Sequence, residues 1–159
     1  MSTDCHIKFD GVEGESPHKD NKGEIEIESW SWGVSNSSGG AAGGGSGRGK
    51  AQPTDFMFVH RYEKASPVLA KHCAQGKHFA TVVLTARKSG EGQKDFLKVT
   101  MKEFFITSVS PSGGGGGDIM ESVSGSFKDI EFAYKPQDDK GGLGGEVKFG
   151  WNTASTEVR

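Results

Sequence analysis

EIEIESWSWGV, residues 24–34, alternates apolar and polar side chains with a period of two, which is the pattern of a half-buried β-strand. The two isoleucines of this stretch occupy odd positions, whereas Trp30 and Trp32 occupy even ones. The apolar side of the strand therefore changes between Glu28 and Trp30. This change predicts either a β-bulge or a switch of the strand from one sheet to another.

A glycine-rich segment follows this strand. Residues 35–49, SNSSGGAAGGGSGRG, are low in complexity and offer no large apolar side chain to a core. Such a segment is flexible unless a partner orders it. Because a long loop inside a compact domain usually carries function, we expect the extended loop, about residues 35–54, to be functional.

The overall composition predicts a single domain, residues 1–159, which is long enough for one core and too short for two. The formal net charge is −2, from 19 basic and 21 acidic residues, so charge repulsion does little to oppose folding. The same balance provides no electrostatic basis for binding nucleic acid or an anionic membrane. We therefore expect neither partner.

The N-terminus, MSTDCHIKFDG, carries charges and has no apolar stretch of signal-peptide length. This start is typical of a protein made in the cytoplasm, and any secretion would proceed without a cleaved leader. No stretch approaches the roughly 20 apolar residues of a membrane helix, so we expect no membrane insertion. The two cysteines, Cys5 and Cys73, are expected to be reduced core residues rather than a disulfide.

Further strands are indicated by alternating apolar residues between turn-forming segments. These strands are predicted at residues 5–9, 55–62, 78–87, 96–109, 121–134 and 146–151. The pair at 78–87 and 96–109 is separated by KSGEGQKD, which predicts a hairpin. Within 121–134 the apolar side changes between Phe127 and Ile130.

One short helix is predicted between Ser66 and Gly76, with Ser66 as N-cap, Pro67 in the first turn and Gly76 as the C-terminal stop. Its apolar stripe is expected to contain Val68, Leu69, His72 and Cys73. The predicted fold class is mainly β, an antiparallel β-barrel or two-sheet sandwich with one short flanking α-helix.

Metal and phosphate sites are not supported by the spacing of the residues. The histidines and cysteines form no CxxC, HxxxH or HExxH pattern, so we predict no metal site and no cofactor. We expect His72 to pack partly buried on the helix, and the remaining histidines to be solvated. These are His6, His18, His60 and His78.

The sequence also contains no recognisable catalytic motif. The stretch GGAAGGGSGRGK lacks the GKS or GKT ending of a phosphate-binding loop, and no G-x-S-x-G elbow precedes a helix. Arg48 and Lys50 could contact an anion, or could simply keep the loop soluble. We therefore predict that the protein is not an enzyme.

Trp30 and Trp32 allow two interpretations. They could form a platform on which sugar rings stack, as in a carbohydrate-binding β-sandwich module. Large aromatic side chains in a strand are more often core residues, because each buries a large apolar area. If the two tryptophans point inward, Ser31 between them points to the opposite surface.

Four motifs together resemble one protein family. They are GVEGES at residues 11–16, EIEIESWSWGVS at 24–35, GKHFATVVLTARKSG at 76–90 and VKFGWN at 147–152. The chain resembles the haemolysin-coregulated protein (Hcp) family, the tube subunit of type VI secretion systems. The likeness runs from about residue 7 to residue 152 in the same order.

The resemblance implies a β-barrel that assembles as a homohexameric ring, with stacked rings forming a tube. Such a tube is propelled out of the bacterium with a spike by a contractile sheath, and its lumen carries and protects small effector proteins. The implied partners are further copies of the chain, sheath proteins, the spike protein, the baseplate and effectors. The implied location is the extracellular space or a target cell, reached from the bacterial cytoplasm without a signal peptide.

The resemblance also implies roles for particular residues. Ser31 is placed on the lumen wall, and contacts between stacked rings are placed on the loop residues Arg48, Lys50, Gln52 and Thr54. Trp30, Trp32 and Trp151 form the structural core motif. Residues 153–159 are expected to be a flexible tail. The alternatives are the carbohydrate-binding module and a small hydrolase.

Overall fold

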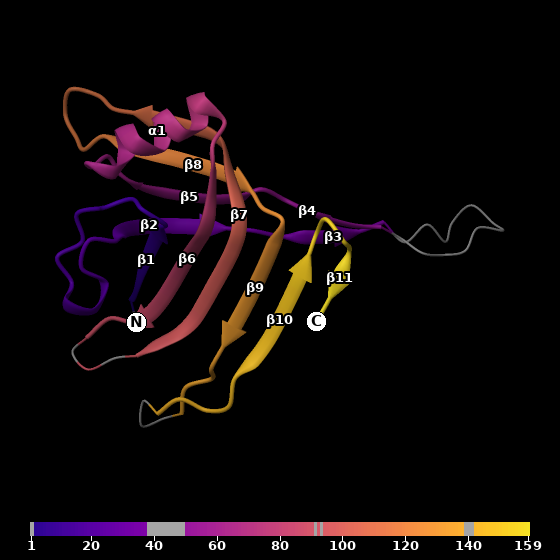
Figure 1. The fold of residues 1–159 in the computed structure, drawn as a ribbon. Helices are drawn as coiled ribbons and strands as arrows, with labels where there is room; N and C mark the ends of the chain where they lie inside the picture. The colour runs from indigo at the N-terminus through magenta and orange to yellow at the C-terminus, as the bar shows by residue number, and fades with distance from the viewer. Residues whose placement is uncertain (1, 38–49, 91, 93, 139–141) are drawn as a thin grey trace.

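Nine strands form one antiparallel sheet in the order β11-β10-β9-β7-β6-β1-β2-β5-β8 (Figure 1). The structure is a computed structural model that describes residues 2–37, 50–90, 92, 94–138 and 142–159. The first strands are β1 (Thr3–Phe9), β2 (Ile25–Ser31), β5 (Phe56–Arg61) and β6 (His78–Lys88). The later ones are β7 (Asp95–Ser112), β8 (Met120–Ser126), β9 (Asp129–Tyr134), β10 (Val147–Asn152) and β11 (Glu157–Val158). A second sheet pairs β3 (Val34–Asn36) with β4 (Ala51–Pro53).

The long strand β7 closes part of this sheet into a barrel. Its residues 97–102 pair with β9, and its residues 105–112 pair with β8 along the same edge. Because β8 also pairs with β5, the strands β1, β2, β5, β8, β7 and β6 form a closed six-stranded barrel. The predicted β-barrel is confirmed. The apolar side of the chain is predicted to change after Phe127, and at this point the chain passes from β8 to β9.

The bulge predicted in the tryptophan strand is present in β2. Ile27 pairs with His60, and Ser29 pairs with Val59, so Glu28 is an extra residue without a partner of its own. The extra residue turns Trp30 to the interior, the side on which Ile27 lies. One strand therefore contributes aliphatic residues to the core before the bulge and aromatic residues after it.

The core has two connected parts. Trp30 in β2, and Trp32, which follows that strand, pack against β9 and β10: the rings of Trp32 and Phe132 are 5.2 Å apart, and those of Trp32 and Phe149 are 6.4 Å apart. Trp30 stacks on Phe56 at 5.8 Å. The other part lies inside the barrel and consists of fully buried side chains from each of its six strands. Among them are Ile7, Phe9, Ile25, Phe58, Leu84, Met101, Phe104, Ile106 and Val123.

A local irregularity in β7 keeps its second half facing the core. Strict alternation from Met101 would place Phe105 inside. Glu103 instead adopts the left-handed conformation, with φ of 52°, and both Phe104 and Ile106 are fully buried. The facing side of β8 carries Gly125, where an added Cβ would lie 2.2 Å from the Phe104 ring. Only glycine fits there.

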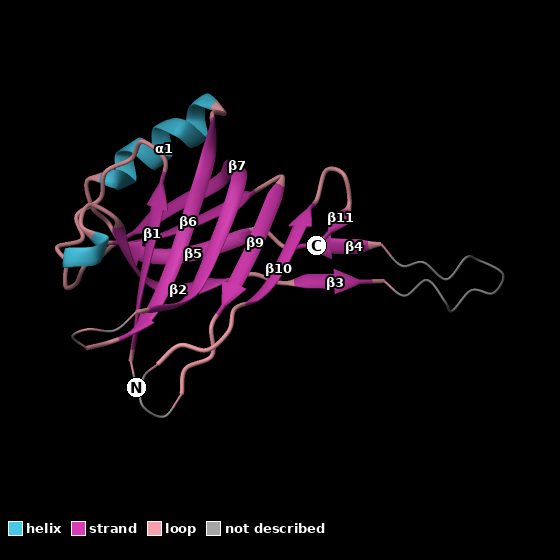
Figure 2. Cartoon of the chain, turned by 60° about the horizontal axis from the view of Figure 1, so that its bottom comes forward, coloured by secondary structure: helices cyan, strands magenta, loops and turns pink. Residues whose placement is uncertain are grey.

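Helix α1 (Ala65–Gln75) crosses one end of the barrel (Figures 1 and 2). Its Leu69 is fully buried in the core, and Gly76 ends it with a φ of 68°, as predicted. Val68, which was expected in the buried stripe, is 36% exposed. Among the described residues no helix is both long enough and apolar enough to cross a membrane.

The start of α1 differs from the prediction. The helix begins at Ala65, so Ser66 lies inside it rather than at the N-cap. The Ser66 hydroxyl accepts a hydrogen bond from the Glu63 backbone N–H, at 3.1 Å, and the Glu63 carboxylate accepts one from the Ala65 N–H, at 3.2 Å. The Glu63 side chain therefore accepts a hydrogen bond from a free amide of the first turn, which is the N-cap role predicted for Ser66.

The C-terminal segment also differs from the prediction of a flexible tail. Residues 153–156 form a turn, after which β11 pairs with β10. The guanidinium of Arg159 donates two hydrogen bonds, each 2.8 Å long, to the carboxylate of Asp129 in β9. This bidentate pair holds the end of the chain against the sheet.

Trp151→Ala is expected to lower the free energy of unfolding by about 3–5 kcal/mol, because this indole is 5% exposed and its removal leaves a cavity. Val147 lies on the same face of β10 but is 65% exposed, so Val147→Ala should change stability by less than about 0.5 kcal/mol. Urea unfolding of both variants, followed by circular dichroism, measures the difference. Equal stability losses would contradict the burial described here.

Candidate assembly surfaces

Strands β3 and β4 form an arm that projects away from the barrel on the side where the chain ends (Figures 1 and 2). The arm is defined here as residues 34–37 and 50–53. Its pairs are Val34 with Pro53, Ser35 with Gln52 and Asn36 with Ala51. All these side chains except the half-buried Ala51 are exposed. The arm therefore packs little of its surface against its own chain.

Hydrogen bonds close the base of the arm and connect it to the barrel. The Thr54 N–H donates to the Gly33 carbonyl at 2.8 Å, and the Gly33 N–H donates to the Thr54 hydroxyl at 2.9 Å. The next residue, Asp55, accepts a hydrogen bond of 2.7 Å from the Thr107 hydroxyl of β7. The arm is thus anchored at its root while its sides remain exposed.

The loop residues suggested for contacts between rings occupy different places. Lys50 and Gln52 are exposed, Gln52 in β4 and Lys50 immediately before it, whereas Thr54 belongs to the anchor. Arg48 lies outside the described residues. Of these positions, Lys50 and Gln52 offer free side chains on the arm.

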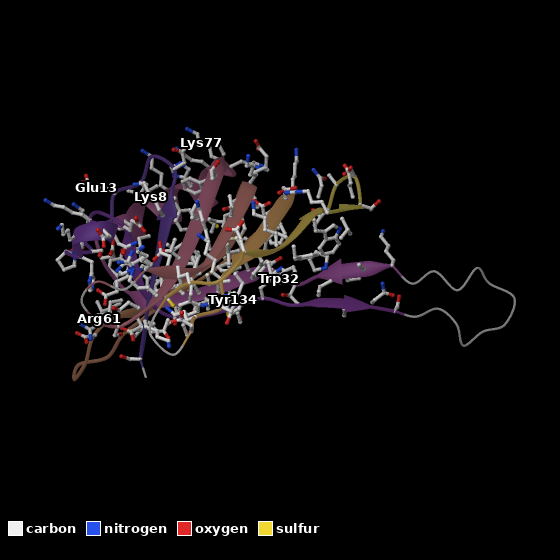
Figure 3. The ribbon with its side chains drawn as sticks, turned by 90° about the horizontal axis from the view of Figure 1, so that it is seen from below. Lys8, Glu13, Trp32, Arg61, Lys77 and Tyr134 are labelled. Carbon is white, nitrogen blue, oxygen red and sulfur yellow. The ribbon has the colours of Figure 1, made fainter. Side chains whose placement is uncertain are left out.

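The three tryptophans of the core motif occupy different places. Figure 3 shows Trp32 where the arm leaves the barrel. Trp30 and Trp32 are half-buried, and Trp151 is buried in the main core. The indole N–H of Trp32 is buried and has no hydrogen-bond partner among the residues that the structure describes.

Ser31 belongs to a face of the barrel that is rich in hydroxyl groups. One cross-strand row runs from Ser31 through Met57 and Ser124 to Ser108. The adjacent row runs from Ser29 through Val59 and Ser122 to Ser110. We call these two rows, which cross β2, β5, β8 and β7, the serine face. None of its eight residues carries a charge.

The opposite face of the molecule is charged. It covers β1, β6, the first half of β7, β9 and β10, and its outward side chains include Lys8, Lys98, Lys102, Glu131 and Lys148. We call it the charged face. Figure 3 shows Lys8 on this side and Arg61, at the rim of the serine face, on the other. The two faces therefore differ in chemistry as well as in direction.

Two histidines expected to be solvated are buried. His60 is fully buried, and its Nε2 lies 2.8 Å from the carboxylate of Glu121, which is also buried. His6 is 1% exposed, and its burial lowers the pKa of the imidazole. His60 shares the apolar face of Phe56 and Phe58, a signal for its burial that the sequence already contained. His72 is half-buried and stacks on Phe79 at 4.3 Å, as predicted.

The two cysteines, Cys5 and Cys73, are free and half-buried. Burial raises the pKa of the Cys5 thiol, and the negative charge of Asp4 raises it further. A hydrogen bond with the Trp30 side chain offsets part of this rise. Cys5 is therefore a weakly reactive thiol at neutral pH.

Comparison with known proteins shows the same family throughout. A family model described as type VI secretion system effector, Hcp, matches residues 6–134. Protein hcp1 of Pseudomonas aeruginosa is 46% identical over 155 residues, which cover 96% of each chain. The crystal structure of Hcp1 from Salmonella typhimurium has a TM-score of 0.83 and 33% identity, with complete coverage of both chains. A structure described as a type six secretion system protein has a TM-score of 0.92, 27% identity and coverage of 99% and 100%.

Native Cys5 should react with iodoacetamide about tenfold more slowly than the same thiol in urea, because both burial and the raised pKa reduce the available thiolate. The rate should keep rising as the pH passes the ordinary thiol value, since the ionised form appears only at higher pH. Mass spectrometry of a Cys73→Ser protein isolates this thiol, and Cys5→Ser serves as the control. A native rate equal to the rate in urea would show the assignment to be wrong.

Proposed function

The chain belongs to the Hcp family of type VI secretion proteins, which are secreted tube subunits and not enzymes, and on this premise we propose that it closes into hexameric rings that stack into a tube. The sheath propels this tube out of the cell together with the spike. The lumen carries small effector proteins and shields them during passage. The function of the chain in this proposal is structural and mechanical, and it catalyses no reaction.

The observation that carries this proposal is the projecting arm. Its two strands are paired only with each other, and they leave backbone edges and the 50% exposed side chain of Val34 open to another molecule. The hydrogen bonds between Gly33 and Thr54 join the two sides of the arm at its root, and Asp55 joins the root to Thr107 of β7, so an arm that reaches a neighbouring ring would transmit force to the barrel. The exposed Lys50 and Gln52 are available to make polar contacts there.

The glycine-rich composition of residues 39–49 determines how strong stacking can be. Glycine loses more conformational entropy on ordering than any other residue. If these residues become ordered when rings meet, that entropy offsets part of the contact energy. Contacts between rings are therefore weaker and more reversible than contacts within a ring.

The serine face is the surface that we assign to the lumen wall. It is broad, uncharged and covered with hydroxyl groups, so it neither strongly attracts nor strongly repels a passing protein. Ser31 lies at one end of its first row, next to the exposed Met57. The charged face is then directed outward, where it favours solubility of the tube and contact with the sheath.

The carbohydrate-binding alternative is not favoured by the packing of the tryptophans. Trp30 is stacked on Phe56, and Trp32 is covered by Phe132 and Phe149. Aromatic rings that are already engaged with other rings leave no open platform for a sugar. The exposed residue between the two tryptophans is Ser31, whose side chain has no ring on which a sugar could stack.

Deletion of residues 39–49 should leave rings intact and abolish tubes at high protein concentration. The deletion retains β3 and β4 and leaves a connection of three residues between Asn36 and Ala51, a length that suits a hairpin. Negative-stain images and sedimentation measure rings and tubes separately. A protein with residues 39–49 reordered, of equal length and composition, is the control and should still stack. Loss of rings, or tubes that persist, would contradict the role of the arm.

Ser31→Gln should leave the melting temperature and the rings unchanged while it alters retention of effectors, because the longer side chain projects from the serine face. Co-purification of effectors and their export from the cell provide the readout. Thr100→Gln, which places the same side chain on the charged face, should leave both unchanged. Unchanged retention and export of every effector in the Ser31→Gln strain would show that this position does not face the lumen.

A further inference from the structure

Two histidines and a glutamate meet on the outer side of the barrel, away from the arm and the serine face. His6 of β1 and Glu26 of β2 are direct cross-strand partners. His18 belongs to the loop of residues 10–24, which folds over these two strands and covers His6. In the described part of the chain, these three residues are the one group whose spacing could hold a metal ion.

The distances within this cluster approach those of a metal site. One ligand atom from each of the three residues lies within 4.8 Å of the other two. The Nε2 atom of His18 is 4.0 Å from the Glu26 carboxylate, and the two imidazole rings meet edge to face with centroids 5.0 Å apart. Donor atoms around tetrahedral zinc are about 3.3 Å apart, given bonds of about 2.0–2.2 Å. The exposed side chains of His18 and Glu26 have to rotate to close this difference.

The buried histidine supplies an independent indication of a ligand. The Nε2 atom of His6 is buried and has no hydrogen-bond partner among the described residues. A buried polar atom without a partner is costly, and such atoms are rare in folded proteins. Coordination of a metal ion by this nitrogen would remove the cost.

The loop that carries His18 is ordered by its own hydrogen bonds. The His18 N–H donates to the Ser16 hydroxyl at 3.3 Å, and the His18 carbonyl accepts from the Asn21 N–H at 3.1 Å. The Asn21 side chain in turn donates to Thr85 of β6, at 3.4 Å. Only the side chains of His18 and Glu26 have to be immobilised when an ion binds, which limits the entropic cost.

Charge also favours a cation here. Glu26 extends from the cluster into a surface pocket whose charged side chains are mostly acidic. The pocket is lined by Glu15, Ser16, Glu26, Glu28, Arg61, Tyr62 and Glu63. Four carboxylates against one guanidinium give this surface a negative potential, which raises the local concentration of divalent cations.

We propose that His6, His18 and Glu26 bind one divalent transition-metal ion, of which zinc is the best match. Imidazole nitrogens suit zinc, nickel and copper, and a carboxylate completes a three-ligand set with a fourth position open to water. The ion joins the loop to both β1 and β2, and it therefore stabilises the N-terminal part of the barrel. This site is independent of the arm and of the serine face.

The chain contains a matched comparison for this site. His78 and Glu103 form a pair at 3.9 Å with side chains 47% and 51% exposed, against 4.0 Å, 45% and 56% for His18 and Glu26. The His78 pair belongs to no three-ligand group among the described residues. It therefore measures what an exposed His–Glu pair binds without a buried third ligand.

The test is a zinc titration of the tag-free, full-length protein after treatment with a chelator, at about pH 7.5, where imidazoles are mostly neutral. Calorimetry should give one zinc per chain, and cobalt in place of zinc should show the intense visible absorption of four-coordinate geometry. His18→Ala and Glu26→Gln should each weaken binding by about tenfold or more. His78→Ala should bind as the unchanged protein does.

Three results would overturn the site: a Kd for zinc above about 0.1 mM, equal binding by His18→Ala, or a comparable loss in His78→Ala. Zinc should also raise the melting temperature of the unchanged protein but not that of His18→Ala. His18 and Glu26 are exposed, so their variants should fold, and the buried His6 need not be altered. Particle images of the His18→Ala protein should still show rings. A failure of the zinc site can therefore be distinguished from a failure of the proposed tube assembly.

Discussion

The pairing of one edge of β7 with two successive strands is the constraint on which the rest of the structure depends. The first half of that edge pairs with β9 and the second half with β8, while the other edge pairs with β6. The pairing with β8 closes the barrel, and the pairing with β9 extends the layer of β1, β6 and β7 through β10 and β11. Trp30 of β2 and Trp32, which follows that strand, pack against the inner side of this extension. Close packing at this junction leaves room only for Gly125 against Phe104.

The single extra residue in β2 connects this architecture to the proposed assembly. Because Glu28 is inserted, Trp30 and Trp32 turn inward and hold the root of the arm, whereas Ser29 and Ser31 turn outward and begin the serine face. A β2 without a bulge would expose the tryptophans on that face and bury the serines. The same strand thus separates a smooth, uncharged surface from an aromatic core, and it leads directly into the arm. The proposed lumen and stacking element are consequences of one local irregularity.

Much of the fold could be predicted from alternation and turn residues, because each strand with one buried face has a period of two. The bulge in β2, the hairpin of β6 and β7, the change of side after Phe127 and the glycine that ends α1 are local features, and all were predictable. The helix start was not, because the Glu63 side chain accepts from the Ala65 N–H while the Ser66 hydroxyl accepts from the Glu63 N–H, an arrangement that only the folded geometry shows. The paired C-terminus depends on Asp129, which lies 30 residues before Arg159.

For the candidate sites, the sequence by itself determined which residues share the alternating positions of β2 and that no familiar metal-binding motif is present. Only the tertiary structure decided that six serines from three strands form one face, that His60 meets Glu121 inside the barrel, and that His6 lies buried beside His18 and Glu26. The physical reason is that periodicity assigns a side chain to one side of its own strand. Which strand lies next to it, and which loop covers it, depends on pairing between segments far apart in the chain.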